Sequence, residues 1–186
     1  EYGVEKKEYF VLSMHREENI DIEYKFKELI KALNSLAETY GLPIIFSTHP
    51  RTWKRLEVDH VALNPLIRNV KSLGFTDYCR LQCDAACVIS DSGTLSEESS
   101  ILRFPAVLLR NSTERPEVLD KGTIVIGGYT EESLLQSVAL AINSFDGEDH
   151  RPKDYCDTNV SSKVVKIIQS YTYIIDDVIW SKNRSS

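Results

Sequence analysis

The stretch "FVLSMHREEN" (residues 10–19) joins a short apolar run directly to a dense polar cluster. A continuous apolar run without polar alternation indicates a strand that is buried on both faces, as in parallel sheets. The cluster that follows it consists of His15, Arg16, Glu17, Glu18 and Asn19. Polar side chains at the carboxyl end of such a strand lie where open parallel sheets bind their ligands. The stretch therefore predicts a fold class and, within it, the place of a site.

Strand and helix patterns alternate along almost the whole chain. Apolar runs predict strands at residues 9–13, 42–48, 69–73, 87–91, 105–110 and 123–128. Apolar spacings of three and four predict helices at residues 23–41, 76–86, 93–104, 115–122, 131–145 and 159–180. This alternation is typical of an α/β fold with a doubly wound, Rossmann-like parallel sheet that is covered by helices on both faces.

The strand order of such sheets brings two polar segments together. In the common order 3-2-1-4-5-6, the first and fourth strands are neighbours whose connections leave in opposite directions, which opens a crevice at their carboxyl ends. The His15 cluster and the segment "DSGT" (91–94) then face each other. The alternative is that the cluster forms an ordinary capped loop on the surface, and the pattern alone leaves both interpretations open.

The stretch "SDSGTLSEESS" (90–100) has the composition of a phosphate-binding turn. Ser92, Gly93 and Thr94 precede a predicted helix, whose unpaired N–H groups and dipole favour an anion. Glu98 lies one turn further along, where a carboxylate suits the two hydroxyl groups of a ribose better than a phosphate. A phosphate followed by a ribose describes a nucleotide. The alternative is a capped helix with a solvated acidic face.

Other features narrow the choice of ligand. The chain has neither G-x-G-x-x-G nor a Walker sequence, which disfavours a nicotinamide cofactor and a P-loop. Arg110 and Arg115 follow the fifth strand and could reach a diphosphate, because guanidinium groups bind two oxygens at once. Arg115 could instead pair with a neighbouring glutamate. His49 and Arg51 follow the second strand on the same rim, although a lone histidine is often structural.

Composition limits the partners and the compartment. The 186 residues carry a net charge of -6 without a basic stripe, which argues against a nucleic-acid duplex. No apolar run approaches the roughly 20 residues of a membrane span, and no signal peptide opens the sequence, so we expect a cytoplasmic protein without a membrane partner. The cysteines are expected to be free thiols, and no metal-ligand spacing is present. The chain begins at Glu1 and its single methionine is Met14, so we expect a piece of a longer protein.

Four motifs taken together resemble one family. The segments "HREEN" (15–19), "THP" (48–50), "SDSGTLSEESS" (90–100) and "RNSTERPEVLDKGT" (110–123) are similar, in order and spacing, to the non-hydrolysing UDP-N-acetylglucosamine 2-epimerases. The resemblance covers nearly the whole chain and implies the C-terminal half of a two-domain, GT-B-like protein whose N-terminal domain is absent. "LGFTDYCRLQ" (73–82), Thr94 and the tail 163–180 look most similar to the branch that makes UDP-N-acetyl-L-fucosamine.

The resemblance implies a role for each matching residue. The ligand would be UDP or a UDP-N-acetylhexosamine. His15 would contact its diphosphate and act in catalysis, Glu98 would bind the ribose, and Tyr78 would pack near the uracil. The phosphates would be held by Ser92, Gly93, Thr94 and Arg115. Further candidates on the same rim are Arg16, His49, Arg51 and Arg110. Thr94 departs from the family, where many members have a second glycine, and this puts the local phosphate contact in doubt.

The implied reaction eliminates UDP to give a glycal-type intermediate and then adds UDP back with inversion at C2, without cofactor or metal. It belongs to the synthesis of cell-surface polysaccharide precursors. The groups that handle the C2 proton lie mainly in the absent domain, so we expect the chain alone to bind UDP weakly and to lack epimerase activity. The full-length protein is expected to be a homodimer.

The resemblance also divides the chain into a UDP-binding domain (1–158) and a C-terminal helix (159–186) that crosses to the other domain. Two alternatives to an epimerase remain. One is the UDP-sugar-binding half of a GT-B glycosyltransferase, which would also place a helix glutamate on the ribose. The other is a non-catalytic nucleotide-sugar sensor.

Overall fold

The computed structural model describes residues 2–182 and contains one parallel sheet. Its strands are β1 (Phe10–Ser13), β2 (Ile44–Thr48), β3 (Ile67–Lys71), β4 (Cys87–Ser90), β5 (Ala106–Leu109) and β6 (Val125–Gly127). They lie in the order β3-β2-β1-β4-β5-β6, which confirms the predicted doubly wound topology. β1 lies between β2 and β4, and Ser13 is paired in register with Ser90. The two segments that follow these residues therefore leave the sheet side by side.

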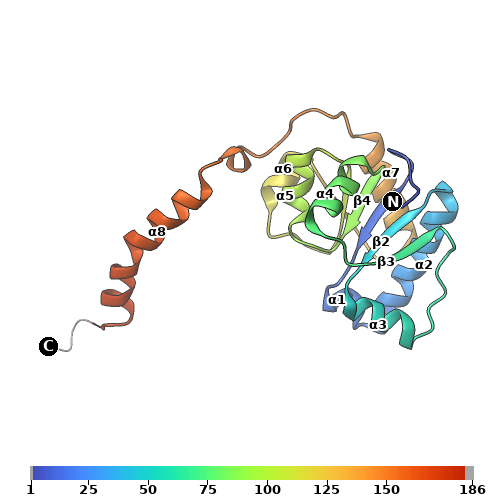
Figure 1. Cartoon of the computed structure of the whole chain (residues 1–186), viewed down its shortest axis with the longest axis horizontal. Coiled ribbons are helices and arrows are strands. Elements are labelled where there is room, and N and C mark those ends of the chain that lie inside the picture. The colour runs from blue at the N-terminus through green and yellow to red at the C-terminus, as the bar shows by residue number, and fades with distance from the viewer. Residues whose placement is uncertain (1, 183–186) are drawn as a thin grey trace. The chain divides into compact units, whose positions relative to one another are not determined.

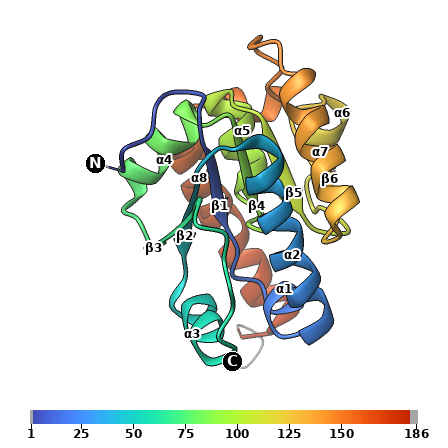
Figure 2. The same ribbon diagram turned by 90° about the vertical axis from the view of Figure 1, so that its right-hand side faces the viewer.

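The helices connect and cover the strands (Figure 1). They are α1 (Glu17–Ile20), α2 (Glu23–Tyr40), α3 (Pro50–Val58), α4 (Phe75–Asp84), α5 (Leu95–Leu102), α6 (Pro116–Asp120) and α7 (Glu131–Asn143). Figure 2 shows α2 and α7 on one side of the sheet and α4 and α5 on the other. Each pair of consecutive strands is connected through at least one helix, as parallel pairing requires.

The main core lies between the sheet and the pair formed by α2 and α7. Phe10 and Leu12 of β1, and Met14 directly after it, enter this cluster and are fully buried. Helix α2 adds Leu29, Leu33 and Leu36, a spacing that places them on one helical face. Gly41 ends α2 with a φ of 63°, in the left-handed region that favours glycine. Strands β1, β2, β4 and β5 are buried on both faces, which accounts for their apolar sequences.

Two of the local differences from the sequence-based prediction concern β3 and the cluster after β1. β3 spans Ile67–Lys71 and so begins two residues before the predicted 69–73, because three of the five residues in its sequence "IRNVK" are polar and give no sharp apolar run. The polar cluster after β1 forms the short helix α1, which was not predicted. A helix of four residues offers too little apolar periodicity to be recognised.

The chain divides into two compact units, Glu1–Pro152 and Lys153–Ser186. The second unit contains a 3₁₀ turn (η1, Lys153–Cys156), α8 (Val160–Ile174) and a π-helical turn (η2, Ile175–Ile179). Up to residue 182, α8 buries none of its side chains within its own unit. Residues 183–186 of the predicted C-terminal segment lie outside the described residues. Within residues 2–182, no helix is long and apolar enough to span a bilayer.

Candidate functional site

The carboxyl ends of β1 and β4 are joined by one buried carboxylate. Asp91 follows β4 and is fully buried. It accepts hydrogen bonds from the backbone N–H of His15 at 3.1 Å, from that of Arg16 at 2.9 Å, and from the side-chain amide of Asn19 at 3.1 Å. Asn19 also donates to the carbonyl of Leu109 at the end of β5, at 3.1 Å. These contacts fix the loop after β1 against the ends of two neighbouring strands.

His15 also contacts Asp91 through its ring. Its Nδ1 lies 3.2 Å from Asp91 Oδ1, and its side chain is 43% exposed whereas that of Asp91 is 0% exposed. The hydrogen bond with Asp91 raises the pKa of His15 above its usual value, against the effect of burial. Burial alone would raise the pKa of Asp91, but the hydrogen bonds from His15, Arg16 and Asn19 outweigh it and hold that pKa below its usual value. The pair therefore favours an imidazolium beside a carboxylate.

Sequence reasoning placed Asp91 and Asn19 in the two segments that meet at the carboxyl ends of the first and fourth strands, but it assigned neither residue a role. Both are buried polar residues whose side-chain partners lie more than 70 positions away in the chain, so no local pattern reveals which groups they bind. The pairing of β1 with β4 offers a signal. Ser13 pairs with Ser90, and each is followed within two residues by a polar residue, so that His15 and Asp91 come at the same end of the sheet. An acid directly after β4 and a histidine after β1 could have been matched in this way.

The segment Ser92–Thr94 forms the turn that leads into α5. The hydroxyl oxygens of Ser92 and Thr94 lie 2.9 Å apart, and the backbone N–H of Ser92 donates to the Ser90 hydroxyl at 3.1 Å. The helix begins at Leu95, two residues later than predicted, with Thr94 as its N-cap. Thr94 is exposed, whereas Ser92 and Gly93 are half-buried. The turn therefore presents two hydroxyl groups and a glycine at the helix start, as an anion site requires.

Glu98 faces α4 as well as the crevice. Its Oε2 accepts a hydrogen bond of 2.7 Å from Gln82 Nε2, and Gln82 is fully buried. Tyr78 lies one turn before Gln82 on α4, and its pKa is raised to about 12, first by burial and then by the charge of Glu98. Hydrogen bonds to Ser13 and Ser90 act on this pKa in the opposite direction. The structure thus places Tyr78 and Glu98 next to each other, close to the ends of β1 and β4.

Arg115 reaches the same turn from the loop after β5. Its Nε is bonded to Glu97, and its Nη1 lies 3.9 Å from Glu114. A Cβ atom added at Gly93 would lie 3.5 Å from Arg115 Nη1, so the guanidinium lies directly over the turn. The residues predicted to bind phosphate in two segments, the Ser92–Thr94 turn and the loop that carries Arg115, therefore lie together.

Arg110 and Arg51 are held by carboxylates. Arg110 is nearly buried and donates to both oxygens of Glu114, at 2.6 and 2.7 Å. Arg51 forms ion pairs of 2.7 and 2.5 Å with Glu17 and Asp21 of the α1 region. Arg110 thereby holds the loop after β5, and Arg51 connects the α1 region to the start of α3.

His49 has a structural task as the N-cap of α3. Its Nδ1 accepts a hydrogen bond from the backbone N–H of Arg51 at 3.3 Å. Its ring also lies near that of His15, with 6.0 Å between the ring centroids. His49 therefore belongs to the same rim, although its cap accounts for one of its two ring nitrogens.

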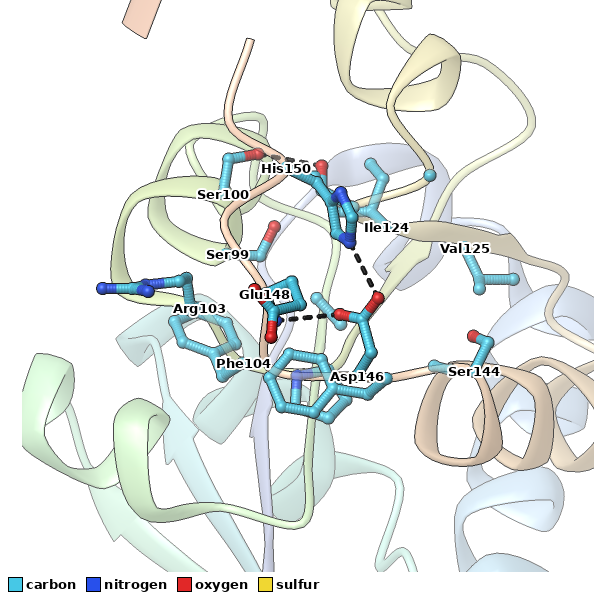
Figure 3. A pocket seen from close by; sticks show the side chains of 16 residues that line it. Ser99, Ser100, Arg103, Phe104, Ile124, Val125, Ser144, Asp146, Glu148 and His150 are labelled. Atoms are coloured by element: carbon cyan, nitrogen blue, oxygen red, sulfur yellow. Dashed lines mark hydrogen bonds and ion pairs between the residues drawn. The ribbon is translucent and has the colours of Figure 1, made fainter. Parts of the chain in front are cut away.

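A separate pocket lies at the other end of the strands, where their amino ends are (Figure 3). It is lined by residues at the amino ends of β5 and β6, among them Ala106 and Val125, and by the segment after α7. In this segment, His150 Nε2 lies 2.8 Å from Asp146 Oδ2. None of the predicted site residues lines this pocket. The predicted site residues instead gather at the carboxyl ends of β1 and β4, which is therefore the candidate site.

Comparison with known proteins agrees with this geometry. Residues 1–169 match the family described as UDP-N-acetylglucosamine 2-epimerase. The chain belongs to this family. A UDP-N-acetylglucosamine 2-epimerase of Methanocaldococcus jannaschii is 35% identical over 140 residues, which cover 73% of this chain and 38% of that protein.

Solved structures of the family share the fold. A crystal structure of the M. jannaschii UDP-GlcNAc 2-epimerase in complex with UDP-GlcNAc and UDP matches with a TM-score of 0.79 and 31% identity, over 87% of this chain and 45% of that one. The epimerase of Rickettsia bellii matches with a TM-score of 0.78 and 38% identity, over 94% of this chain and 47% of that one. The chain thus spans less than half the length of these epimerases.

Proposed function

We propose that this chain is the nucleotide-binding half of a UDP-N-acetylhexosamine 2-epimerase. The observation that carries the proposal is the convergence of the Ser92–Thr94 turn, Glu98 and Arg115 beside the His15–Asp91 pair. Hydroxyl groups and a helix start suit phosphate, and a carboxylate one turn further along suits a ribose. Membership of the epimerase family supports UDP as the nucleotide.

The phosphate contacts come from two sides. Ser92, Gly93 and Thr94 bind one face of the diphosphate through hydroxyl and backbone N–H groups at the start of α5. Arg115 and His15 approach from the loops after β5 and β1. Because Arg115 already lies over Gly93, it can bind a phosphate oxygen in exchange for its contact with Glu97. The additional side chain at Thr94 is exposed and bonded to Ser92, so it leaves the turn open.

The nucleoside contacts follow along α5 and α4. Glu98 accepts hydrogen bonds from the ribose hydroxyls, and its orientation is set by Gln82. Tyr78 packs near the uracil, because it lies beside Glu98 on the neighbouring helix. Arg16, His49, Arg51 and Arg110 shape the rim of the crevice and are assigned no direct contact.

The proposed reaction proceeds by loss and return of UDP. The C2 proton is removed and the bond from C1 to the diphosphate oxygen breaks, which gives a glycal-type intermediate and UDP. UDP then adds back at C1, and a proton is delivered to the other face of C2. Negative charge develops on the diphosphate, so His15, Arg115 and the start of α5 stabilise the transition state. The groups that exchange the C2 proton are supplied by a second domain, and this chain alone has no epimerase activity.

The second unit is assigned to the contact with that domain. Val164, Ile167, Ile168 and Tyr171 lie at helical spacing on α8 and would be covered by the N-terminal domain of a GT-B-like protein. The sequence cues at 73–82, Thr94 and 163–180 support the branch that makes UDP-N-acetyl-L-fucosamine for cell-surface polysaccharide. The complete protein is proposed to be a cytoplasmic homodimer.

The first experiment is a calorimetric titration of this chain with UDP, beside a Glu98→Ala variant of the same chain. Saturable binding that the substitution weakens about tenfold, as expected for loss of hydrogen bonds to a charged group, supports the proposal. Equal affinity for both proteins contradicts the ribose assignment. If neither binds at millimolar UDP, the titration is repeated with a protein that carries both domains, and absence of binding there contradicts the proposal.

A further inference from the structure

We propose that Asp91 is a positioning residue for the reaction: it holds His15 with Nδ1 toward the protein and Nε2 toward the diphosphate. The inference rests on the proposed function and adds a residue to its site. It starts from the observation that a fully buried carboxylate receives all its described hydrogen bonds from one short segment, the loop after β1.

The contacts of Asp91 fix both the backbone and the ring of His15. The N–H groups of His15 and Arg16 bind the carboxylate, which sets the path of the main chain. The Nδ1 atom lies 3.2 Å from Oδ1, which sets the rotation of the ring about its side-chain bonds. In the neutral ring, the proton then resides on Nδ1, because a carboxylate accepts and does not donate. Nε2 is then left to accept or donate elsewhere, on a side chain that is 43% exposed.

Asn19 keeps the carboxylate in place. It donates one amide hydrogen to Asp91 Oδ2 and the other to Leu109, so it ties Asp91 to the end of β5. The orientation of His15 is thus determined by strands β1, β4 and β5 together. A side chain held by three strands loses little further freedom when a ligand binds, which is the benefit of preorganisation.

The charge of Asp91 has a second effect on His15. The hydrogen bond with Asp91 is the largest influence on the pKa of His15 and raises it, while burial and the charge of Arg16 lower it. Other titratable or charged groups near the pair include His49, Tyr78 and Arg110. Two of these are basic and one is a phenol that stays neutral at ordinary pH, so the carboxylate is the group that favours the imidazolium.

An imidazolium in this orientation donates Nε2–H to a phosphate oxygen. The proton stays on His15, and the hydrogen bond strengthens as negative charge develops on the departing diphosphate. Asp91 itself stays ionised and touches no part of the substrate. Its contribution to the reaction passes through His15.

The first test observes the His15 ring directly by NMR titration. The His15 signals are assigned by their loss in a His15→Gln variant, and the tautomer is taken from the ring ¹⁵N shifts at high pH. In the unaltered chain, we expect the neutral ring to carry its proton on Nδ1 and the pKa to lie above that of an unperturbed histidine. In Asp91→Asn, the pKa should fall. In the control Asn19→Ala, which removes another donor from the same carboxylate, it should not fall.

The second test links the ring to the ligand. Affinity for UDP is measured by calorimetry as the pH is raised through the pKa of His15, in the unaltered chain and in Asp91→Asn. Affinity should decline over this range, and in Asp91→Asn the decline should move to lower pH, with a loss of about tenfold at neutral pH. The phosphate of UDP titrates identically in both series. Uridine, which lacks phosphate, should show no such shift.

The outcomes separate this inference from the proposed function. An Nε2–H tautomer in the unaltered chain overturns the inference without any variant, even if Asp91→Asn fails to fold. A His15 pKa that Asp91→Asn leaves unchanged also overturns it. If UDP binds to neither this chain nor a two-domain protein, the proposed function is overturned, and the tautomer still decides whether Asp91 orients His15.

Discussion

The side-chain amide of Gln82 donates a 2.7 Å hydrogen bond to Glu98, and so joins α4 to α5 across the crevice. Gln82 is fully buried, and its Oε1 has no hydrogen-bond partner among the described residues. A buried amide with one unsatisfied oxygen costs free energy. This cost is accounted for by the Nε2 group of the same amide, which orients the carboxylate of Glu98.

Replacement of Gln82 by leucine should therefore separate binding from stability. The variant loses the bond to Glu98 but also removes a buried unpaired oxygen, so we expect the free energy of unfolding to change by no more than about 1 kcal/mol. Affinity for uridine and for UDP should fall by the same factor, because both ligands carry the ribose. Thermal unfolding and calorimetry measure the two effects. A loss seen with UDP alone would show that Glu98 serves the phosphates instead.

Glu97 and Glu98 are adjacent on α5 but have different partners, which permits a matched comparison. Glu97 binds Arg115, so it competes with a phosphate for the guanidinium. In Glu97→Gln, we expect UDP to bind up to about fivefold more tightly, the range of a partly exposed ion pair, and uridine to bind as before. Weaker binding of UDP would mean that Glu97 positions Arg115 for the ligand and does not compete with it.

Gly93 tests the phosphate turn without disturbing the fold. A Cβ atom there would meet Arg115 Nη1 at 3.5 Å, an ordinary contact, so Gly93→Ala should alter the free energy of unfolding by less than about 1 kcal/mol. The methyl group would nevertheless occupy the place of a phosphate, and UDP affinity should fall at least tenfold while uridine affinity is kept. Unchanged UDP binding would place the diphosphate elsewhere.

Gly127 provides the control, because a side chain at this position is excluded by the packing of the sheet and not by a ligand. A Cβ atom would lie 2.6 Å from Val107 Cγ1 on the neighbouring strand. Gly127→Ala should therefore destabilise the chain by about 1–3 kcal/mol through overpacking. The loss should appear in chemical denaturation, with UDP affinity of the folded protein preserved.

The order of the strands and the position of the crevice could be predicted from the sequence. Buried parallel strands such as β1 and β4 are continuous apolar runs, and the crossover rules leave few arrangements of them. Ser92, Gly93 and Thr94 were found because a turn that feeds a helix is local in sequence. These features depend on neighbours in the chain or on general topology, which sequence patterns record.

The contacts of the site could not be predicted because they join distant segments. Asp91 meets the loop after β1 across 75 and 76 positions, and Gln82 reaches Glu98 from another helix. The carboxylates that hold Arg51 come from the unpredicted helix α1 and the residue after it. Composition shows that charges can pair but does not show which pairs form.

The ion pair between Arg110 and Glu114 should appear in the acid stability of the chain. It holds the pKa of Glu114 at about 2 instead of 4.5. Because the pKa is lower in the folded state, the pair contributes stability above pH 4.5, and this contribution is lost as the pH falls toward about 2. In Arg110→Met, the difference in unfolding free energy from the unaltered chain should therefore shrink over this range. Acids that do not interact with Arg110 are present in both proteins and cancel in the difference.

The partner variant should have a larger effect at neutral pH. Glu114 is exposed, so water replaces Arg110 when the arginine is removed, and the methionine fills the space of its stem. Glu114→Gln instead leaves a nearly buried guanidinium with Glu18, 3.6 Å away, and the buried Asp91, which also has its own partners, as nearby carboxylates. An under-compensated buried charge is more costly than the absence of the pair, so Glu114→Gln should unfold at lower denaturant than Arg110→Met at pH 7. The reverse order would show that Glu18 compensates Arg110 fully and that Glu114 contributes little.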